Sequence, residues 1–366
     1  MALLLLEAFL RLVDPLGQRL RGDQIVLPAN TRVVLTQAEN PRLDREIVVT
    51  RNSLGFRGPE PPADFDRRLT VVTVGGSTTE CRYLGDGKDW PARLGEELGR
   101  SLGGLWIENA GLDGHSTFGH QKLLEQRVLK LRPRVVIFLL GINDVARDRL
   151  KYQDRALTER SDQDASERWA NWAARHSAVA ALAQNAWRAR QARRVPLIQP
   201  VLDLRALPHD ASGRRGRAVA RAHRALFAPG YRERVLGLVQ ACGQAGIVPV
   251  LMTQPALYGP AVDDLTGVDL GTIEVDPQDG TNGAVAWATL EAYNDVLREV
   301  GQAQGVPVVD VARQLPKSSR YFYDFVHFTN DGAQAVARLA ARALCPTLSE
   351  RFPQHVARPC PEAEDR

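Results

Sequence analysis

LTVVTVGGSTT, residues 69–79, is the stretch that decides the fold. Its first six residues form an almost unbroken run of apolar and β-branched side chains, and the glycines Gly75 and Gly76 follow. Such a run is typical of a strand buried on both faces of a parallel sheet. Two glycines permit a tight turn, after which Ser77 stands where a helix begins. The stretch therefore predicts a central strand that presents a serine at the carboxyl edge of a sheet.

Strand and helix patterns alternate on both sides of this stretch. Such alternation with short connections predicts an α/β fold, with helices covering both faces of a mainly parallel sheet. The further strands are expected at 105–108, 134–140, 247–253 and 306–311, and the helices at 89–102, up to 130, 231–243, 284–304 and 330–344.

Two insertions interrupt the alternation of strands and helices, and further segments flank it at both ends. Short β-prone runs broken by Pro and Asn precede the core, and an Ala-, Arg- and Trp-rich helical stretch divides it. The predicted parts are an amphipathic, membrane-proximal helix at 1–22, a β-rich lead-in at 23–66, a core domain at 67–346 with insertions at 148–230 and 259–282, and a tail at 347–366.

Composition excludes several classes of protein. Of 366 residues 44% are hydrophobic and 25% charged, which argues against a disordered chain, a collagen or a membrane bundle. The net charge of +4 is too small to indicate nucleic-acid binding, and no nucleic-acid-binding motif is present.

The positive charge is concentrated in one segment. Residues 185–235 hold twelve Arg and three acids, whereas residues 259–282 hold six acids and no basic residue. Both segments belong to the insertions, so we expect them to shape access to the site and to influence the choice of substrate.

The amino-terminal sequence MALLLLEAFLRLVDP is too short an apolar run to span a bilayer, and it makes a poor cleavable signal. On a helix, Glu7, Arg11 and Asp14 share one polar stripe. This pattern suits an interfacial helix that associates with a membrane surface through residues 1–14, or the end of a longer anchor. A helix docked on its own domain is the alternative.

The four cysteines show no metal-binding or redox spacing. Cys345 and Cys360 are expected to pair if the protein is exported; otherwise all four cysteines are unpaired thiols. His115 and His120 lie five residues apart and miss the spacing of a helical zinc pair. No metal is therefore expected.

Polar residues follow the ends of successive strands. Ser77 follows the first strand, Gly111 the second and Asn143 the third, while Asp324 and His327 precede the last helix. An Asp three residues before a His can hold the imidazole so that it faces a serine, as nucleophilic catalysis requires. Separately, these residues have structural explanations: a helix cap, turn residues, and a His packed among aromatic side chains.

The joint order of these residues resembles the SGNH, or GDSL-type, hydrolase superfamily, whose four blocks carry Ser, Gly, Asn and His. The resemblance implies a three-layer α/β/α, flavodoxin-like fold. GGSTT replaces the Gly-Asp-Ser of the family's name, and Asn52 to Arg57 resembles a lead-in of membrane-anchored bacterial members linked to exopolysaccharide loci.

Carried onto this sequence, the resemblance implies that Ser77 is the nucleophile, His327 its general base, and Asp324 the residue that orients His327. The Ser77 N–H, the Gly111 N–H and the Asn143 side chain would form the oxyanion hole. No metal or organic cofactor is needed.

The expected activity is hydrolysis of an O-acyl ester, an O-acetyl ester above all, on a carbohydrate or envelope polymer outside the cytoplasm. A cytoplasmic location stays open. An O-acyltransferase with the same triad and a catalytically silent scaffold of polysaccharide assembly are the alternatives.

Other residues have weaker assignments. His115 is expected at the rim of the pocket, or in a capping or packing role, and Gly76 is assigned to substrate binding. Cys81 is expected to pack. Three tryptophans of the first insertion are expected to form the core of its helices, with an aromatic sugar platform as the alternative: Trp169, Trp172 and Trp187.

Overall fold

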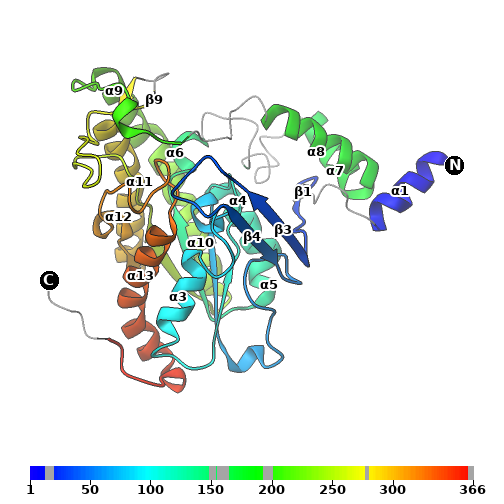
Figure 1. Cartoon of the computed structure of the whole chain (residues 1–366). Helices are drawn as coiled ribbons and strands as arrows, with labels where there is room; N and C mark the ends of the chain where they lie inside the picture. Colours follow the sequence, from blue (N-terminus) through cyan, green and yellow to red (C-terminus); the bar gives the residue numbers. More distant parts are fainter. Residues whose placement is uncertain (13–19, 148–153, 155–164, 193–200, 277–279, 362–366) are drawn as a thin grey trace.

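We describe a computed structural model of the whole chain (Figure 1). The structure describes residues 1–12, 20–147, 154, 165–192, 201–276 and 280–361.

A parallel sheet of five strands forms the centre of the molecule, in the order β11-β8-β7-β5-β6. All seven residues of β5 (Leu69–Gly75) are buried, as the apolar run predicts. The neighbouring strands align with it in parallel register, Val72 beside Glu108 on one side and beside Val136 on the other. The other strands are β6 (Leu105–Asn109), β7 (Val135–Leu140), β8 (Val248–Thr253) and β11 (Val308–Val309).

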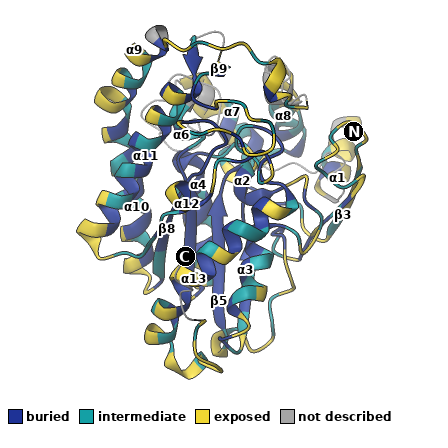
Figure 2. Ribbon diagram, turned by 60° about the vertical axis from the view of Figure 1, so that its left-hand side comes forward, coloured by how far each residue is buried: buried dark blue, intermediate teal, exposed yellow. Residues whose placement is uncertain are grey.

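Alternate residues of the strands pack against two helical layers. Leu69 and Val71 face a core shared with α3 (Trp90–Leu98) and α13 (Asn330–Arg351), whereas Val72 and Val74 face the opposite layer. Figure 2 shows the sheet buried between the helices. The opposite layer comprises α4 (Thr117–Leu123), which continues through η2 (Leu124–Val128) and α5 (Leu129–Leu131), together with α10 (Ala228–Gln244) and α11 (Gly283–Gln304). The three-layer α/β/α prediction is confirmed.

The boundaries of some elements differ from the predictions. β11 is only two residues long, and α13 continues through Pro346 to Arg351 rather than ending at Leu344. The remaining short elements are α2 (Ser77–Glu80), η1 (Phe65–Arg67), α6 (Asp144–Arg147), η4 (Leu204–Ala206), α9 (Arg214–Ala222), η5 (His223–Phe227), β9 (Glu274–Asp276), β10 (Thr281–Asn282), α12 (Val311–Gln314) and η6 (Pro353–His355).

Residues 20–51 contain two small antiparallel hairpins. One joins β1 (Leu20–Arg21) to β2 (Gln24–Ile25), and the other joins β3 (Thr31–Thr36) to β4 (Glu46–Arg51). Strands β2, β3 and β4 lie within the predicted lead-in at 23–66, whereas β1 lies in the segment predicted as a helix at 1–22, for which the structure describes a helix only at Ala2–Leu12.

Three helices project away from the body (Figure 1): α1 (Ala2–Leu12), α7 (Ala165–His176) and α8 (Ala178–Ala192). The predicted tryptophan core of the insertion is wrong. Trp169, Trp172 and Trp187 are 68%, 57% and 51% exposed, because α7 and α8 pack on each other through small residues such as Ala174 and Ala181. Among the described residues, the structure holds no helix long and apolar enough to cross a membrane.

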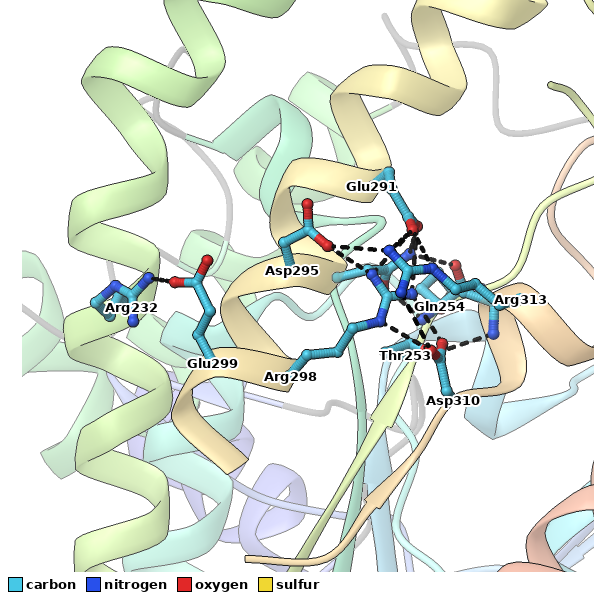
Figure 3. A network of polar contacts seen from close by, with 11 residues as sticks. Arg232, Thr253, Gln254, Glu291, Asp295, Arg298, Glu299, Asp310 and Arg313 are labelled. Atoms are coloured by element: carbon cyan, nitrogen blue, oxygen red, sulfur yellow. Dashed lines mark hydrogen bonds and ion pairs between the residues drawn. The ribbon is translucent and has the colours of Figure 1, made fainter. Parts of the chain in front are cut away.

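A cluster of ion pairs fastens the carboxyl end of the sheet (Figure 3). The Arg298 guanidinium donates to Asp295 at 2.7 Å and to Asp310 at 2.8 Å, and it also contacts Glu291 at 2.9 Å. Burial alone would raise the pKa of Asp310, but hydrogen bonds from Arg298 and Thr253 outweigh it and lower that pKa. The cluster ties α11 to the chain that leaves β11 and, through Thr253, to the end of β8.

Cys345 and Cys360 form a disulfide that ties the tail to α13. Cys81 and Cys242 are free and buried. Of the two alternatives, a Cys345–Cys360 disulfide or four unpaired thiols, the structure shows the disulfide.

The disulfide closes a loop of 15 residues, and a cross-link of this size stabilises a folded chain by about 3 kcal/mol. Replacing both cysteines by Ala is expected to lower the free energy of unfolding by about that amount in urea titrations. Reductant should destabilise the wild-type protein to the same extent and leave the double variant unchanged. A wild-type protein insensitive to reductant would contradict the pairing.

Candidate active site

Ser77, His327 and Asp324 form a continuous hydrogen-bonded chain. The Ser77 Oγ lies 2.7 Å from His327 Nε2, and His327 Nδ1 lies 2.7 Å from Asp324 Oδ2. The other carboxylate oxygen, Oδ1, accepts the backbone N–H groups of Val326 and His327, each at 2.8 Å. Asp324 is thereby fixed, and the imidazole faces the serine. The structure brings the three predicted triad residues together across 250 positions of sequence.

The imidazole is held by stacking as well as by hydrogen bonds. The Tyr323 ring lies parallel to the His327 ring, with 5.6 Å between centroids and 11° between planes. Burial alone would lower the pKa of His327, but the charge of Asp324 and its hydrogen bond outweigh burial and raise that pKa. The arrangement suits a base that must accept the serine proton and hold it as an imidazolium.

Because Gly76 has no side chain, Asn143 and the His115 carbonyl can pack directly beside Ser77. A Cβ on Gly76 would lie 2.3 Å from the Asn143 Nδ2 and 3.0 Å from the His115 carbonyl oxygen. Asn143 Nδ2 donates one hydrogen to that carbonyl at 2.8 Å, which orients the amide beside Ser77. An amide nitrogen has two hydrogens, so the second is the candidate donor to an oxyanion.

His115 reaches the site through its backbone. Its carbonyl holds Asn143, whereas its ring lies against Gly119 and 6.4 Å from the ring of His120. Its half-buried position agrees with the rim placement, and the substrate-binding role assigned to His115 and Gly76 stays a prediction.

The Gly111 N–H, predicted to belong to the oxyanion hole, has an acceptor within the protein. This N–H donates to the Asn109 Oδ1 at 2.9 Å. Gly111 also serves close packing, since a Cβ there would lie 2.2 Å from the Glu80 backbone nitrogen. The Ser77 N–H fits the prediction better, because it lies in the first turn of α2, where N–H groups have no acceptor within the helix.

Cys81 has the packing role expected. It ends α2 in the left-handed conformation, with φ of 48°, and it is buried. Burial raises the pKa of its thiol, so it is not a competing nucleophile. Among the described residues, no group of three or more His, Cys, Asp or Glu side chains is arranged to hold a metal ion.

Residues 73–233 match the GDSL-like lipase/acylhydrolase family. This segment is similar to a GDSL-like lipase/acylhydrolase domain. The matched region contains Ser77, Gly111 and Asn143 and ends before Asp324 and His327, which the fold brings to the serine. The matched segment, together with the contacts of Ser77, His327 and Asp324, supports an SGNH-type hydrolase.

Solved structures with a similar fold include three proteins of this group. An acetylxylan esterase from Geobacillus stearothermophilus is 15% identical, with 75% of this chain and 94% of that chain covered and a TM-score of 0.43. A lipase/acylhydrolase from Enterococcus faecalis is 15% identical, with 76% and 96% covered and a TM-score of 0.43. A G-D-S-L family protein from Desulfitobacterium hafniense is 14% identical, with 76% and 100% covered and a TM-score of 0.41. No curated protein matches the chain.

The acylhydrolase site is supported by a buried carboxylate that the sequence did not single out. Glu80 lies on α2, three residues after the nucleophile. Its Oε1 accepts from Arg51 Nη2 at 2.5 Å, and its Oε2 accepts from the Asp113 N–H at 2.6 Å. Because Asp113 lies two residues before His115, Glu80 connects the nucleophile helix to the loop that orients Asn143.

A second buried arginine ends the nucleophile helix. Arg57, only 2% exposed, donates from Nη1 to the carbonyls of Glu80 at 2.6 Å and Cys81 at 2.8 Å. Its backbone pairs with Asn109 through hydrogen bonds of 3.0 Å and 2.9 Å. Arg57 thus binds two carbonyls at the end of this short helix and fixes them relative to β6. The motif from Asn52 to Arg57 gave the only sequence signal for this contact.

The other side of the nucleophile is tied to β8. The Thr78 hydroxyl donates to the Gln254 Oε1 at 3.0 Å, and the Gln254 N–H donates to the Asn294 Oδ1 at 2.8 Å. Asn294 also contacts Glu291 at 3.3 Å, which belongs to the ion cluster in Figure 3. Side-chain pairing across such distant positions leaves no pattern in a single sequence, so Gln254 and Asn294 were missed.

Activity is expected to fall as pH drops through the pKa of His327, because protonated imidazole cannot accept the Ser77 proton. Because the pKa of His327 is raised, this fall should lie above the pH at which an ordinary histidine titrates. Asp324→Asn should lower kcat by about 10⁴-fold and move the residual acid limb to lower pH, since burial then dominates. Ester hydrolysis measured from pH 5 to 9 tests this. An unmoved acid limb in the variant would contradict the assigned pair.

Glu80→Gln is expected to lower kcat by about 10- to 100-fold, because an amide cannot accept from both partners and the loop that holds Asn143 shifts. The acid limb should stay in place, since Asp324 and His327 are untouched. Glu96→Gln, the same change on an exposed face of α3, is the control. Wild-type kcat in a folded Glu80→Gln variant would show that Glu80 does not position the site.

Proposed function

We propose that the acylhydrolase is a serine esterase that removes an O-acyl group, above all an O-acetyl group, from a carbohydrate or envelope polymer. The observation that carries the proposal is the Asp324–His327–Ser77 chain, with both hydrogen bonds at 2.7 Å. Nucleophile, base and orienting carboxylate are then within the distances that acyl transfer through serine requires.

The reaction proceeds in two steps. The Ser77 Oγ attacks the ester carbonyl while His327 Nε2 takes the hydroxyl proton, and the carbonyl oxygen becomes an oxyanion. The Asn143 amide and the Ser77 N–H stabilise that charge. The C–O bond to the alcohol breaks, and the alcohol leaves with the proton from His327. Water then attacks the acyl-serine with His327 again as base, which releases the acid and restores Ser77.

Aromatic and polar groups beside the triad support a sugar substrate. Tyr83 is 42% exposed and lies 6.3 Å from Tyr323, which stacks on the catalytic imidazole. Asp113 is exposed on the loop after β6. An exposed ring can pack on a sugar face while carboxylate and hydroxyl groups bond its hydroxyls.

We also propose that the protein acts outside the cytoplasm. The Cys345–Cys360 disulfide supports this, because disulfides persist in oxidising compartments and are rare in the cytosol. Fractionation of cells that produce the tagged protein tests this, and recovery of the protein with reduced thiols from the cytosol would refute it.

Ser77→Ala is expected to abolish release of p-nitrophenol from its acetate ester and release of acetate from acetylated xylan. Mass spectrometry of the wild-type protein quenched during turnover should show one added acetyl group on Ser77. Equal rates of p-nitrophenol release by wild type and variant would contradict the proposal. Acetate transferred to an added sugar in place of free acid would identify an O-acyltransferase instead.

A further inference from the structure

The amino-terminal helix is attached to the molecule by its polar residues. Glu7 accepts the Ala178 N–H at 2.8 Å, the Val179 N–H at 3.1 Å and the Ser177 hydroxyl at 2.8 Å. These groups form the first turn of α8, where N–H groups have no acceptor within the helix, so Glu7 caps α8 from a neighbouring helix. The hydrogen bonds from Ala178, Val179 and Ser177 lower the pKa of Glu7 to about 2.

Arg11 adds a contact at the same corner. Its Nη2 donates to the carbonyl of His176, the last residue of α7, at 2.7 Å, and its Nε donates to Glu7 at 2.8 Å. Leu10 is the buried apolar contact of α1. The corner between α7 and α8 therefore holds the polar stripe of α1.

This attachment reverses the usual arrangement of an amphipathic helix. Such a helix normally buries its apolar face and exposes its charges. Here Leu4, Leu5 and Phe9 are 72%, 65% and 53% exposed, while the charged residues make the contacts. An apolar helix surface left outward in this way marks an interaction site.

The same part of the molecule carries the exposed tryptophans. We call residues 1–12 and 165–192 the arm; it projects from the body in Figure 1. Arg175 pairs with Asp23 beside β1, and the Asn185 side chain donates to the Leu20 carbonyl at 2.7 Å. The arm is thus fixed to the β1–β2 hairpin, with its outer surface clear of the body.

We infer that the arm docks on the surface of a lipid bilayer, with the Leu and Phe side chains of α1 and the Trp side chains of α7 and α8 entering the headgroup region. Trp favours this region because it combines a large apolar ring with a polar N–H, and Leu and Phe supply apolar area just below it.

The charges of the arm favour anionic lipid. Residues 1–12 and 165–192 hold five Arg and two Glu, and one of the two, Glu7, is engaged in the α8 cap. Asp23, at the attachment of the arm, pairs with Arg175. Arg168 and Arg190 are exposed. Exposed Arg beside an apolar surface is attracted to anionic headgroups.

Sedimentation of the full chain with vesicles tests the inference. Wild type should pellet with vesicles of phosphatidylcholine and phosphatidylglycerol, and less with phosphatidylcholine alone. Leu5→Gln/Phe9→Gln should weaken this partition at least tenfold. The control is Val33→Gln/Val34→Gln, which changes two residues of the body that are 46% and 45% exposed, and it should bind as wild type does.

Three outcomes would overturn the inference: no pelleting of wild type, equal pelleting of the arm variant, or a wild-type dimer in vesicle-free ultracentrifugation that the arm variant abolishes. The last would show that a second copy covers the arm. Hydrolysis of p-nitrophenyl acetate by the arm variant should equal that of wild type. Failure of the membrane inference therefore leaves the esterase proposal untouched, and the reverse also holds.

Discussion

The active site depends on the close approach of Asn143 and the His115 carbonyl to the backbone of residue 76, which a Cβ atom at this position would prevent. Gly76 has no side chain, and the Asn143 amide and the His115 carbonyl occupy the space where one would lie. The ends of β5 and β7 and the loop after β6 consequently meet at the nucleophile. The parallel sheet places these ends at one edge, and the fourth partner, His327, arrives from the loop before α13. Glu80 and Gln254 then fix the short helix α2 from two sides.

Local patterns in the sequence predict the sheet, whereas the triad was predicted from the joint order of Ser77, Asp324 and His327 and its resemblance to SGNH hydrolases. A buried β-branched run that ends at Gly75 and Gly76 can be read without a structure, and so can an Asp three residues before a His. The oxyanion role predicted for the Gly111 N–H competes with a hydrogen bond from this group to Asn109. The sequence shows that Gly111 follows a strand, but not that the side chain two positions earlier accepts its N–H. Hydrogen-bond competition of this kind is decided by tertiary geometry.

Local patterns also did not predict which Trp and Arg side chains are exposed to solvent. Trp side chains on Ala-rich helices favour a helical core, yet α7 and α8 meet through alanines and leave the rings outside. Among the arginines between residues 185 and 235, by contrast, some that the charge pattern places on the surface are engaged in contacts within the protein. Arg234 lies 3.9 Å from the Phe118 ring centroid and donates to the Thr117 hydroxyl at 2.7 Å. A charge count therefore overstates the basic surface available to a partner.

The first 66 residues contribute both to the arm and to the active site. Their outer end is the apolar helix α1, and their inner end places the buried side chains of Arg51 and Arg57 against α2. Between them, the β3–β4 hairpin region contacts the loop that carries the general base: Arg42 donates to the Phe322 carbonyl at 3.2 Å, and Asp44 accepts from Asn330 at 3.3 Å and from Lys88 at 2.7 Å. The lead-in thus contacts the nucleophile segment and the histidine segment, which lie 250 residues apart. A bilayer that held α1 would then orient the active site relative to its surface. The connection runs from α1 to α8, from Asn185 of α8 to β1, and from the lead-in to the triad segments.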